Sequence, residues 1–122
     1  MRLLIALLVI AFTASPLSAQ IDKFEFERTL DTKYCGSFKL SLFQCSDFDP
    51  PEDNFIDEVC YDAKRDLMLL ALNKKGDVYC HCGLGVAKVN EFLHSLEMGR
   101  FYNYQIKGRF HCPGIDRRFP KQ

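Results

Sequence analysis

The sequence contains no tryptophan, no Asn-x-Ser/Thr sequence and no Gly-x-Ser-x-Gly motif. The second absence excludes N-glycosylation, and the third argues against a serine hydrolase of the kind that carries its nucleophile in that motif. Internal repeats and low-complexity segments are also missing. The 16 Lys and Arg residues balance the 16 Asp and Glu residues. Net charge therefore argues neither for nor against a polyanionic partner, and nothing else in the sequence calls for a nucleic acid, so we expect none.

Long hydrophobic runs are absent as well. The apolar run from Leu3 to Phe12 is much shorter than the roughly 20 residues that a transmembrane helix needs. It follows the basic Arg2 and is followed by small residues up to Ala19, which is typical of a secretory signal peptide. We therefore predict a signal peptide at residues 1–19 and no transmembrane segment. Residues 20–122 are predicted to form a single secreted, extracellular, cysteine-rich domain with a basic, partly disordered tail from about residue 113.

The cysteine count is the strongest signal in the chain. An even number of cysteines in a short secreted chain indicates disulfides, here three. Two of the cysteines stand one residue apart in the stretch VYCHCGLG. Because Val78, Cys80 and Cys82 alternate with Tyr79 and His81, residues 78–82 are predicted to form a strand with both thiols on one face. The six cysteines are Cys35, Cys45, Cys60, Cys80, Cys82 and Cys112.

Structural disulfides explain these cysteines better than metal binding or redox chemistry. On a strand, His81 points away from Cys80 and Cys82, so the three cannot meet one zinc ion, and an oxidising compartment favours disulfides. A bond between Cys80 and Cys82 would close a very small ring. We therefore predict no metal site and no cofactor. Cys60 and Cys112 are the favoured partners of Cys80 and Cys82, which leaves Cys35 with Cys45, but the sequence does not fix the connectivity.

The spacing of apolar and turn-forming residues predicts an α+β fold, a small disulfide-stapled domain with two helices packed on a short antiparallel sheet. One helix is expected from Asp49 to Arg65, where Asp49, Pro50 and Glu52 resemble a helix start. The segment 67–72 is favoured as a helix, and the alternative is a strand that leads through a hairpin turn at NKKGD into residues 78–82. Further strands are expected at residues 24–26, 38–42 and 100–112, and a second helix at residues 86–98 with Gly99 as its C-terminal cap.

Basic and aromatic residues gather near the C-terminus. We interpret them as a contact surface and predict a secreted, non-catalytic binding or effector-like protein that recognises an extracellular protein or an anionic glycan. The alternative is that this basic segment faces the acidic segment 47–66 of the same domain. The predicted binding residues are Arg100, Phe101, Tyr102, Tyr104, Lys107, Arg109, Arg117 and Arg118.

Two other functions stay open at this point. His81 and His111 each adjoin a cysteine, so disulfides could bring their imidazoles together as the acid and base of a small ribonuclease-like hydrolase. The simpler interpretation is that both are strand residues facing the core or the solvent, and no catalytic residues are assigned. A lipid carrier would need an internal cavity, which a sequence does not show. The sequence also leaves the oligomeric state open.

Overall fold

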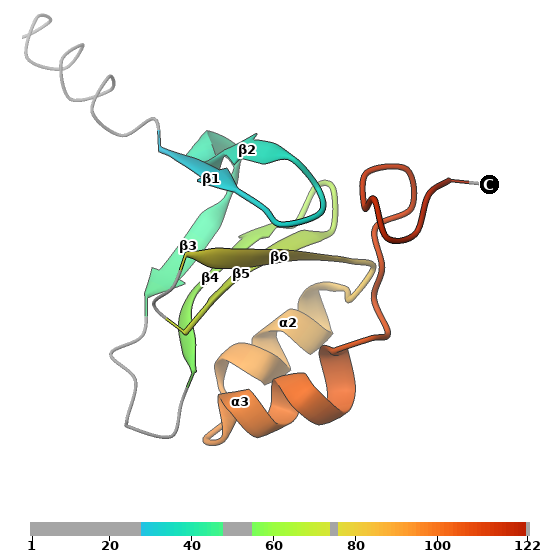
Figure 1. Cartoon of the computed structure of the whole chain (residues 1–122). Helices are drawn as coiled ribbons and strands as arrows, with labels where there is room; N and C mark the ends of the chain where they lie inside the picture. Colours follow the sequence, from blue (N-terminus) through green and yellow to red (C-terminus); the bar gives the residue numbers. More distant parts are fainter. Residues whose placement is uncertain (1–27, 48–54, 74–75, 122) are drawn as a thin grey trace, which may run out of the picture.

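The computed structural model describes residues 28–47, 55–73 and 76–121. The predicted signal peptide and the predicted strand at residues 24–26 lie outside these ranges. The described chain is built around an antiparallel sheet in which neighbouring strands follow the sequence order (Figure 1). Its strands are β3 (Gln44–Asp47), β4 (Ile56–Asp62), β5 (Leu67–Leu72) and β6 (Asp77–Cys82).

Two further layers cover the two faces of this sheet (Figure 1). On one face lies a hairpin of β1 (Thr29–Asp31) and β2 (Ser37–Lys39), which continues into a short 3-10 helix, η1 (Leu40–Leu42). On the other face lie α2 (Val86–Leu93), α3 (Met98–Phe101) and the π-helix η2 (Tyr102–Ile106). The α+β class is confirmed, although the helices are shorter and the sheet is larger than the sequence predicts.

Apolar side chains fill both spaces between the layers. The helix-side core combines Met68, Leu70 and Leu72 of β5 with buried residues of the helices, such as Phe92 and Ile106. The hairpin-side core combines Leu67 and Leu69 of β5 with Leu40, Phe43 and three of the buried cysteines, Cys35, Cys80 and Cys112. Strand β5 is therefore buried on both faces, which explains why LMLLAL shows no alternation. The helix favoured there from the sequence is wrong.

The helix expected from Asp49 to Arg65 is also wrong over its described part, because Ile56–Asp62 is strand β4; residues 48–54 are outside the described ranges. The register between β4 and β5 shifts between Ile56 and Glu58. This bulge lets Ile56 and Val59 both join the helix-side core, although they stand three residues apart. Buried residues three apart are typical of one face of a helix, but here a bulged strand produces the same spacing.

The expected strand over residues 100–112 is helical in its first half. Met98, Tyr102 and Ile106 are four residues apart and all buried, which is the spacing of one helix face. Gly99, predicted to cap the preceding helix, lies inside α3 instead, while α2 ends at Leu93. The expected strand at residues 38–42 ends at Lys39, after which Leu40 is buried and Leu42 is exposed.

Three disulfides cross-link the described chain. They pair Cys35 with Cys80, Cys45 with Cys60, and Cys82 with Cys112. The prediction that Cys80 and Cys82 leave one face of β6 for different partners is confirmed, as is the choice of Cys112 for one of them. The choice of Cys60 as the other partner and the pairing of Cys35 with Cys45 are wrong, because Cys60 bonds to Cys45, which lies directly opposite it across the β3–β4 pair, and Cys80 bonds to Cys35.

The C-terminal segment, expected to be partly disordered, packs on the domain from residue 113 to Lys121. Its amide groups at Asp116 and Arg117 donate hydrogen bonds to the carbonyls of Cys112 and Tyr34, at 2.8 and 3.0 Å. The Asp116 side chain is buried. Within the described residues, no helix has the length and apolar character needed to cross a membrane.

Candidate binding pocket

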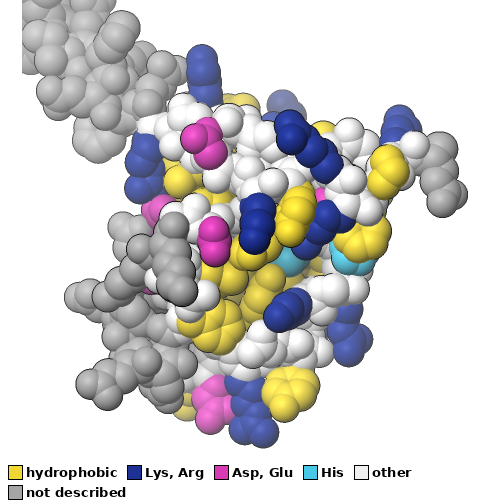
Figure 2. All heavy atoms as spheres, in the orientation of Figure 1, with side chains coloured by type: hydrophobic (Ala, Val, Ile, Leu, Met, Phe, Trp, Pro, Cys, Tyr) yellow, Lys and Arg dark blue, Asp and Glu magenta, His cyan; other side chains and the backbone are white. Residues whose placement is uncertain are grey.

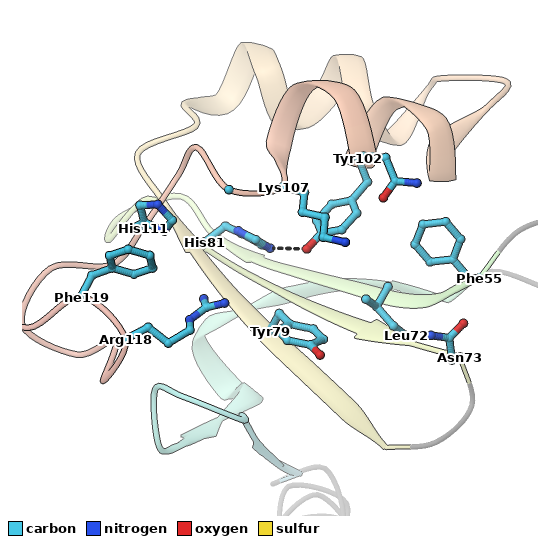
Figure 3. A pocket seen from close by; sticks show the side chains of 12 residues that line it. Phe55, Leu72, Asn73, Tyr79, His81, Tyr102, Lys107, His111, Arg118 and Phe119 are labelled. Carbon is cyan, nitrogen blue, oxygen red and sulfur yellow. Dashed lines mark hydrogen bonds between the residues drawn. The ribbon is translucent and has the colours of Figure 1, made fainter.

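A pocket of about 570 Å³ opens between strand β6, helix η2 and the C-terminal segment (Figure 3). This volume lies within the range of small-molecule sites in proteins, roughly 300–1,000 Å³. Residues from five separate stretches of the chain form its walls. They are Phe55, Leu72, Asn73, Tyr79, His81, Tyr102, Asn103, Lys107, Gly108, His111, Arg118 and Phe119.

Strand β6 contributes Tyr79 and His81 to the pocket. Their side chains face the helices because Cys80 and Cys82, which alternate with them, face the hairpin-side core. The two disulfides at Cys80 and Cys82 therefore fix the side of the strand on which His81 lies. The prediction that His81 points away from the thiols is confirmed. One face of β6 thus carries the disulfides, and the other lines the pocket.

His81 is buried and hydrogen-bonded. Its Nε2 atom lies 3.1 Å from the hydroxyl oxygen of Tyr102, and the two rings meet edge to face with centroids 5.4 Å apart (Figure 3). Burial lowers the pKa of His81 to about 4, opposed by a hydrogen bond to the Phe110 backbone. Burial also raises the pKa of Tyr102 to about 12. At neutral pH the imidazole is thus uncharged, and its Nε2 atom shares a hydrogen bond with the Tyr102 hydroxyl.

The π-helix positions Tyr102 and Lys107 together. The amide of Lys107 donates a 2.8 Å hydrogen bond to the carbonyl of Tyr102, five residues earlier. Such a wide turn brings residues five apart above one another, and π turns occur frequently at functional sites. The side chains of Tyr102 and Lys107 consequently both extend into the pocket (Figure 3). Among the described residues, none forms a hydrogen bond or ion pair with the Lys107 ammonium group.

The C-terminal segment contributes Arg118, Phe119 and His111. The Arg118 guanidinium donates to the buried Asp116 carboxylate through Nε and Nη2, at 3.1 and 2.9 Å, and this pairing lowers the pKa of Asp116. It also lies 4.1 Å from the centre of the Tyr34 ring. His111 stacks on Phe119 with ring centres 3.6 Å apart. The aspartate, the tyrosine and the stacked ring together hold Arg118 in one orientation.

The charge of the pocket is one-sided. Lys107 and Arg118 line it, whereas none of its lining residues is acidic. In the described ion pairs of the basic C-terminal residues, Arg118 pairs with Asp116 and Arg100 with Glu97. Neither acidic partner belongs to the segment 47–66. A lining with positive and no negative side chains attracts anionic ligands. Because no lining residue is acidic, the pocket also lacks the pair of carboxyl groups that some hydrolases use as general acid and base.

The structure divides the predicted binding residues into three groups. Tyr102, Lys107 and Arg118 line the pocket. Arg100, Phe101 and Tyr104 line a shallower hollow of about 260 Å³ elsewhere on the helices. Arg109 and Arg117 are exposed and line neither. His81 and His111, the histidines of the hydrolase hypothesis, line the same pocket.

Several lining residues were missed from the sequence, including Phe55, Tyr79 and Phe119. Tyr79 could have been found, because it alternates with the two cysteines of β6 exactly as His81 does. Phe55 and Phe119 follow no pattern in the sequence. Only the packing of their segments against η2 and β6 brings them to the pocket. Figure 2 shows the exposed side of this region, where Lys and Arg side chains lie around apolar and histidine side chains.

Comparison with known proteins gives one finding. Residues 52–110 match the family model of the KTSC domain, a span of just under half of the chain. No curated protein and no solved structure matches the chain. Each of the three disulfides joins a cysteine inside the matched span to one outside it. His111, Arg118 and Phe119 also lie outside the span, so a KTSC-like core supplies most of the pocket and a disulfide-bonded flank completes it.

Proposed function

We propose that the protein is a secreted, non-catalytic binding domain that recognises an anionic group of an extracellular partner. The observation that carries this proposal is the pocket, which gathers Lys107, Arg118 and aromatic rings with no acidic residue in its walls. A concave site with apolar walls and a few convergent polar groups is the usual form of a binding site. Arg109 and Arg117, which follow Gly108 and precede Arg118 of the pocket lining in the sequence, are exposed and add positive charge to the same segments of the chain.

The state of His81 supports binding rather than catalysis. A general acid or base works best with a pKa near the operating pH, whereas the pKa of His81 is lowered to about 4. Its Nε2 atom is also engaged by Tyr102. The ring therefore serves to shape the pocket wall. An extracellular location is supported by the three disulfides, which form and persist in oxidising compartments.

Retention on immobilised heparin, a soluble polyanion, tests the charged surface. Replacing Arg109 and Arg117 together by Glu should lower the salt concentration at which the protein elutes, because two attractive charges become repulsive. The matched control replaces Lys39 and Lys64, two exposed lysines outside the pocket, by Glu with the same change in net charge. Equal losses in both double variants would mean that only net charge matters, which contradicts a localised surface.

A ribonuclease-like hydrolase is the second candidate, because His81, His111 and Lys107 line one pocket. It predicts that the purified protein cleaves RNA or simple esters, and that His81→Ala abolishes the cleavage. The binding proposal predicts no turnover by either protein. Cleavage by the wild type that disappears in His81→Ala would overturn the non-catalytic proposal.

A further inference from the structure

We infer that the ligand of the pocket is a small amphipathic carboxylate, with its charged head beside Arg118 and Lys107 and its apolar part against Tyr79, Phe55 and Leu72. This inference rests on the proposed binding function and names the ligand class for it. It follows from the distribution of side chains along the pocket, from the net charge at its cationic end, and from the volume of the space.

The pocket has two chemically different ends (Figure 3). Phe55 and Leu72 lie at one end, Arg118 and His111 at the other, and the Tyr79 and Tyr102 rings lie between them. Phe55 packs edge to face on Tyr102, with ring centres 6.3 Å apart, so the apolar wall is continuous. A ligand that fills this space must present an apolar surface to the rings and a charge to the cations, which defines an amphipathic molecule.

The net charge at the cationic end favours a single negative charge on the ligand. Asp116 compensates the charge of Arg118 through two hydrogen bonds, which occupy Nε and Nη2 but not Nη1. The Lys107 ammonium has no such partner among the described residues. His81 adds no charge, because burial lowers its pKa to about 4. Of Arg118, Lys107 and His81, only Lys107 thus brings an uncompensated positive charge to the pocket, which matches a carboxylate better than a dianionic phosphate.

The cationic end also depends on the flank of the domain. Arg118 and His111 lie beyond the KTSC-like span, in the segment that the disulfide between Cys82 and Cys112 holds against β6. The Cys82 amide additionally donates a 3.3 Å hydrogen bond to the Phe110 carbonyl. The flank therefore adds Arg118 and His111 to the pocket, whereas Lys107, the cation without a carboxylate partner, belongs to the KTSC-like core.

Titration of the oxidised full-length protein with decanoate, decanol and decyltrimethylammonium tests the inference, because these probes share a chain and differ in the head group. Calorimetry should show tightest binding for decanoate. Shortening the acid should weaken binding by roughly two- to fourfold per methylene. In NMR spectra, decanoate should shift the ring signals of His81 and His111 but not those of His94, which does not line the pocket.

Two variants locate the ends of the ligand. Lys107→Ala should weaken decanoate binding about tenfold, the loss of one charge-assisted contact, and leave decanol unaffected. Lys39→Ala, at an exposed lysine of β2, is the matched control and should change neither. Phe55→Leu should weaken decanoate and decanol equally. Because Phe55 also packs against Tyr102, the chain-length series on the wild type provides the same information if that variant does not fold.

Three outcomes would overturn the inference. These are equal binding of decanol and decanoate, tighter binding of decyl phosphate, and binding of anionic phosphatidylglycerol vesicles in the absence of decanoate binding. The last outcome would assign the site to a membrane surface instead. If decanoate fails to bind while the Arg109 and Arg117 variant still loses heparin retention and its control does not, only the ligand class is wrong. If decanoate does not bind and the Arg109 and Arg117 variant loses no more heparin retention than its control, the proposed binding function is wrong as well.

Discussion

His81 shows how a titratable side chain becomes a structural one. It sits between two segments, with Tyr102 on one side and the Phe110 backbone on the other. Besides burial, the ionisable groups that face it have opposing effects, since Arg118 and His111 lower its pKa and Asp116 raises it. Burial is the largest cause of the shift and makes the protonated ring unfavourable in the fold. The neutral form of His81 is therefore the form that the folded protein requires.

This requirement predicts a pH dependence of stability. The pKa of His81 is about 4 in the folded protein and 6.5 without the fold, so between these values the unfolded chain binds more protons. Acidification from pH 7 to pH 4 should cost on the order of 3 kcal/mol of unfolding free energy through this residue alone. Urea unfolding of the wild type and of His81→Gln at pH 4, 5 and 7 measures the difference, since glutamine does not titrate.

The stability difference between these two proteins should shrink as the pH falls. Subtracting the unfolding free energy of the variant from that of the wild type at each pH removes the contributions of the carboxylates, which titrate in both proteins. A direct NMR titration of the His81 ring provides a second measurement. A His81 pKa near 6.5 in the folded protein, or parallel stability curves for the two proteins, would contradict the prediction.

At the scale of elements, the sequence predicts the strand with the cysteines best. Alternation identifies Val78–Cys82 and separates the face of His81 from the face of the thiols, because β6 has one face in each core. The same rule fails for β5, whose two faces are both apolar, and for β4, where the bulge shifts the alternation. Alternation reveals a strand only when its two faces lie in different environments and when its register with the neighbouring strands is constant. Neither condition can be verified before the neighbouring strands are known.

The candidate site is predictable only in part for a related reason. Tyr102, Lys107 and Arg118 were selected because they are basic or aromatic, and their convergence depends on a π turn and on the packing of the C-terminal segment. The alternation of Tyr102, Tyr104 and Ile106 with polar residues favours a strand. The four-residue spacing of Met98, Tyr102 and Ile106 indicates a helix, but Gly99 within it is typical of a helix C-terminus and so argues against one. Its actual role is to make room for a ring.

Gly99 allows α3 to approach Phe55. A Cβ atom at this position would lie 2.8 Å from Cε1 of the Phe55 ring, which is too close for two carbon atoms. Gly99→Ala should therefore displace the ring and reduce the unfolding free energy by about 1–3 kcal/mol, despite the better helix propensity of alanine. It should also weaken decanoate binding, because Phe55 lines the apolar end of the pocket.

A double-mutant cycle with Phe55→Leu isolates this contact. In the leucine background the cost of Gly99→Ala should become smaller, since the aromatic carbon that meets the new methyl group is gone. Urea unfolding of the four proteins provides the coupling energy. An equal cost in both backgrounds would show that Gly99 is needed for another reason.

At the scale of the whole molecule, the chain consists of a KTSC-like core with covalently attached flanks. The core comprises β4, β5, β6 and the helices, while the hairpin, β3 and the C-terminal segment lie outside the matched span. Each flank is joined to the core by disulfides. In the chain-entropy description a bridge stabilises a fold mainly by restricting the unfolded chain. The bridge between Cys82 and Cys112 has a second role, because its flank completes the pocket.

The two roles can be separated by removing bridges in pairs. Cys82→Ser with Cys112→Ser opens a separation of 30 residues and should cost about 3–4 kcal/mol of unfolding free energy. Cys45→Ser with Cys60→Ser opens a separation of 15 residues and should cost a similar amount, about 3 kcal/mol. Only the first pair should alter the NMR signals of His111 and weaken decanoate binding, because Arg118 and His111 belong to the segment that this bridge holds. Under conditions where both variants remain folded, loss of binding in the second variant but not in the first would contradict the assignment of the pocket's cationic end to the C-terminal flank.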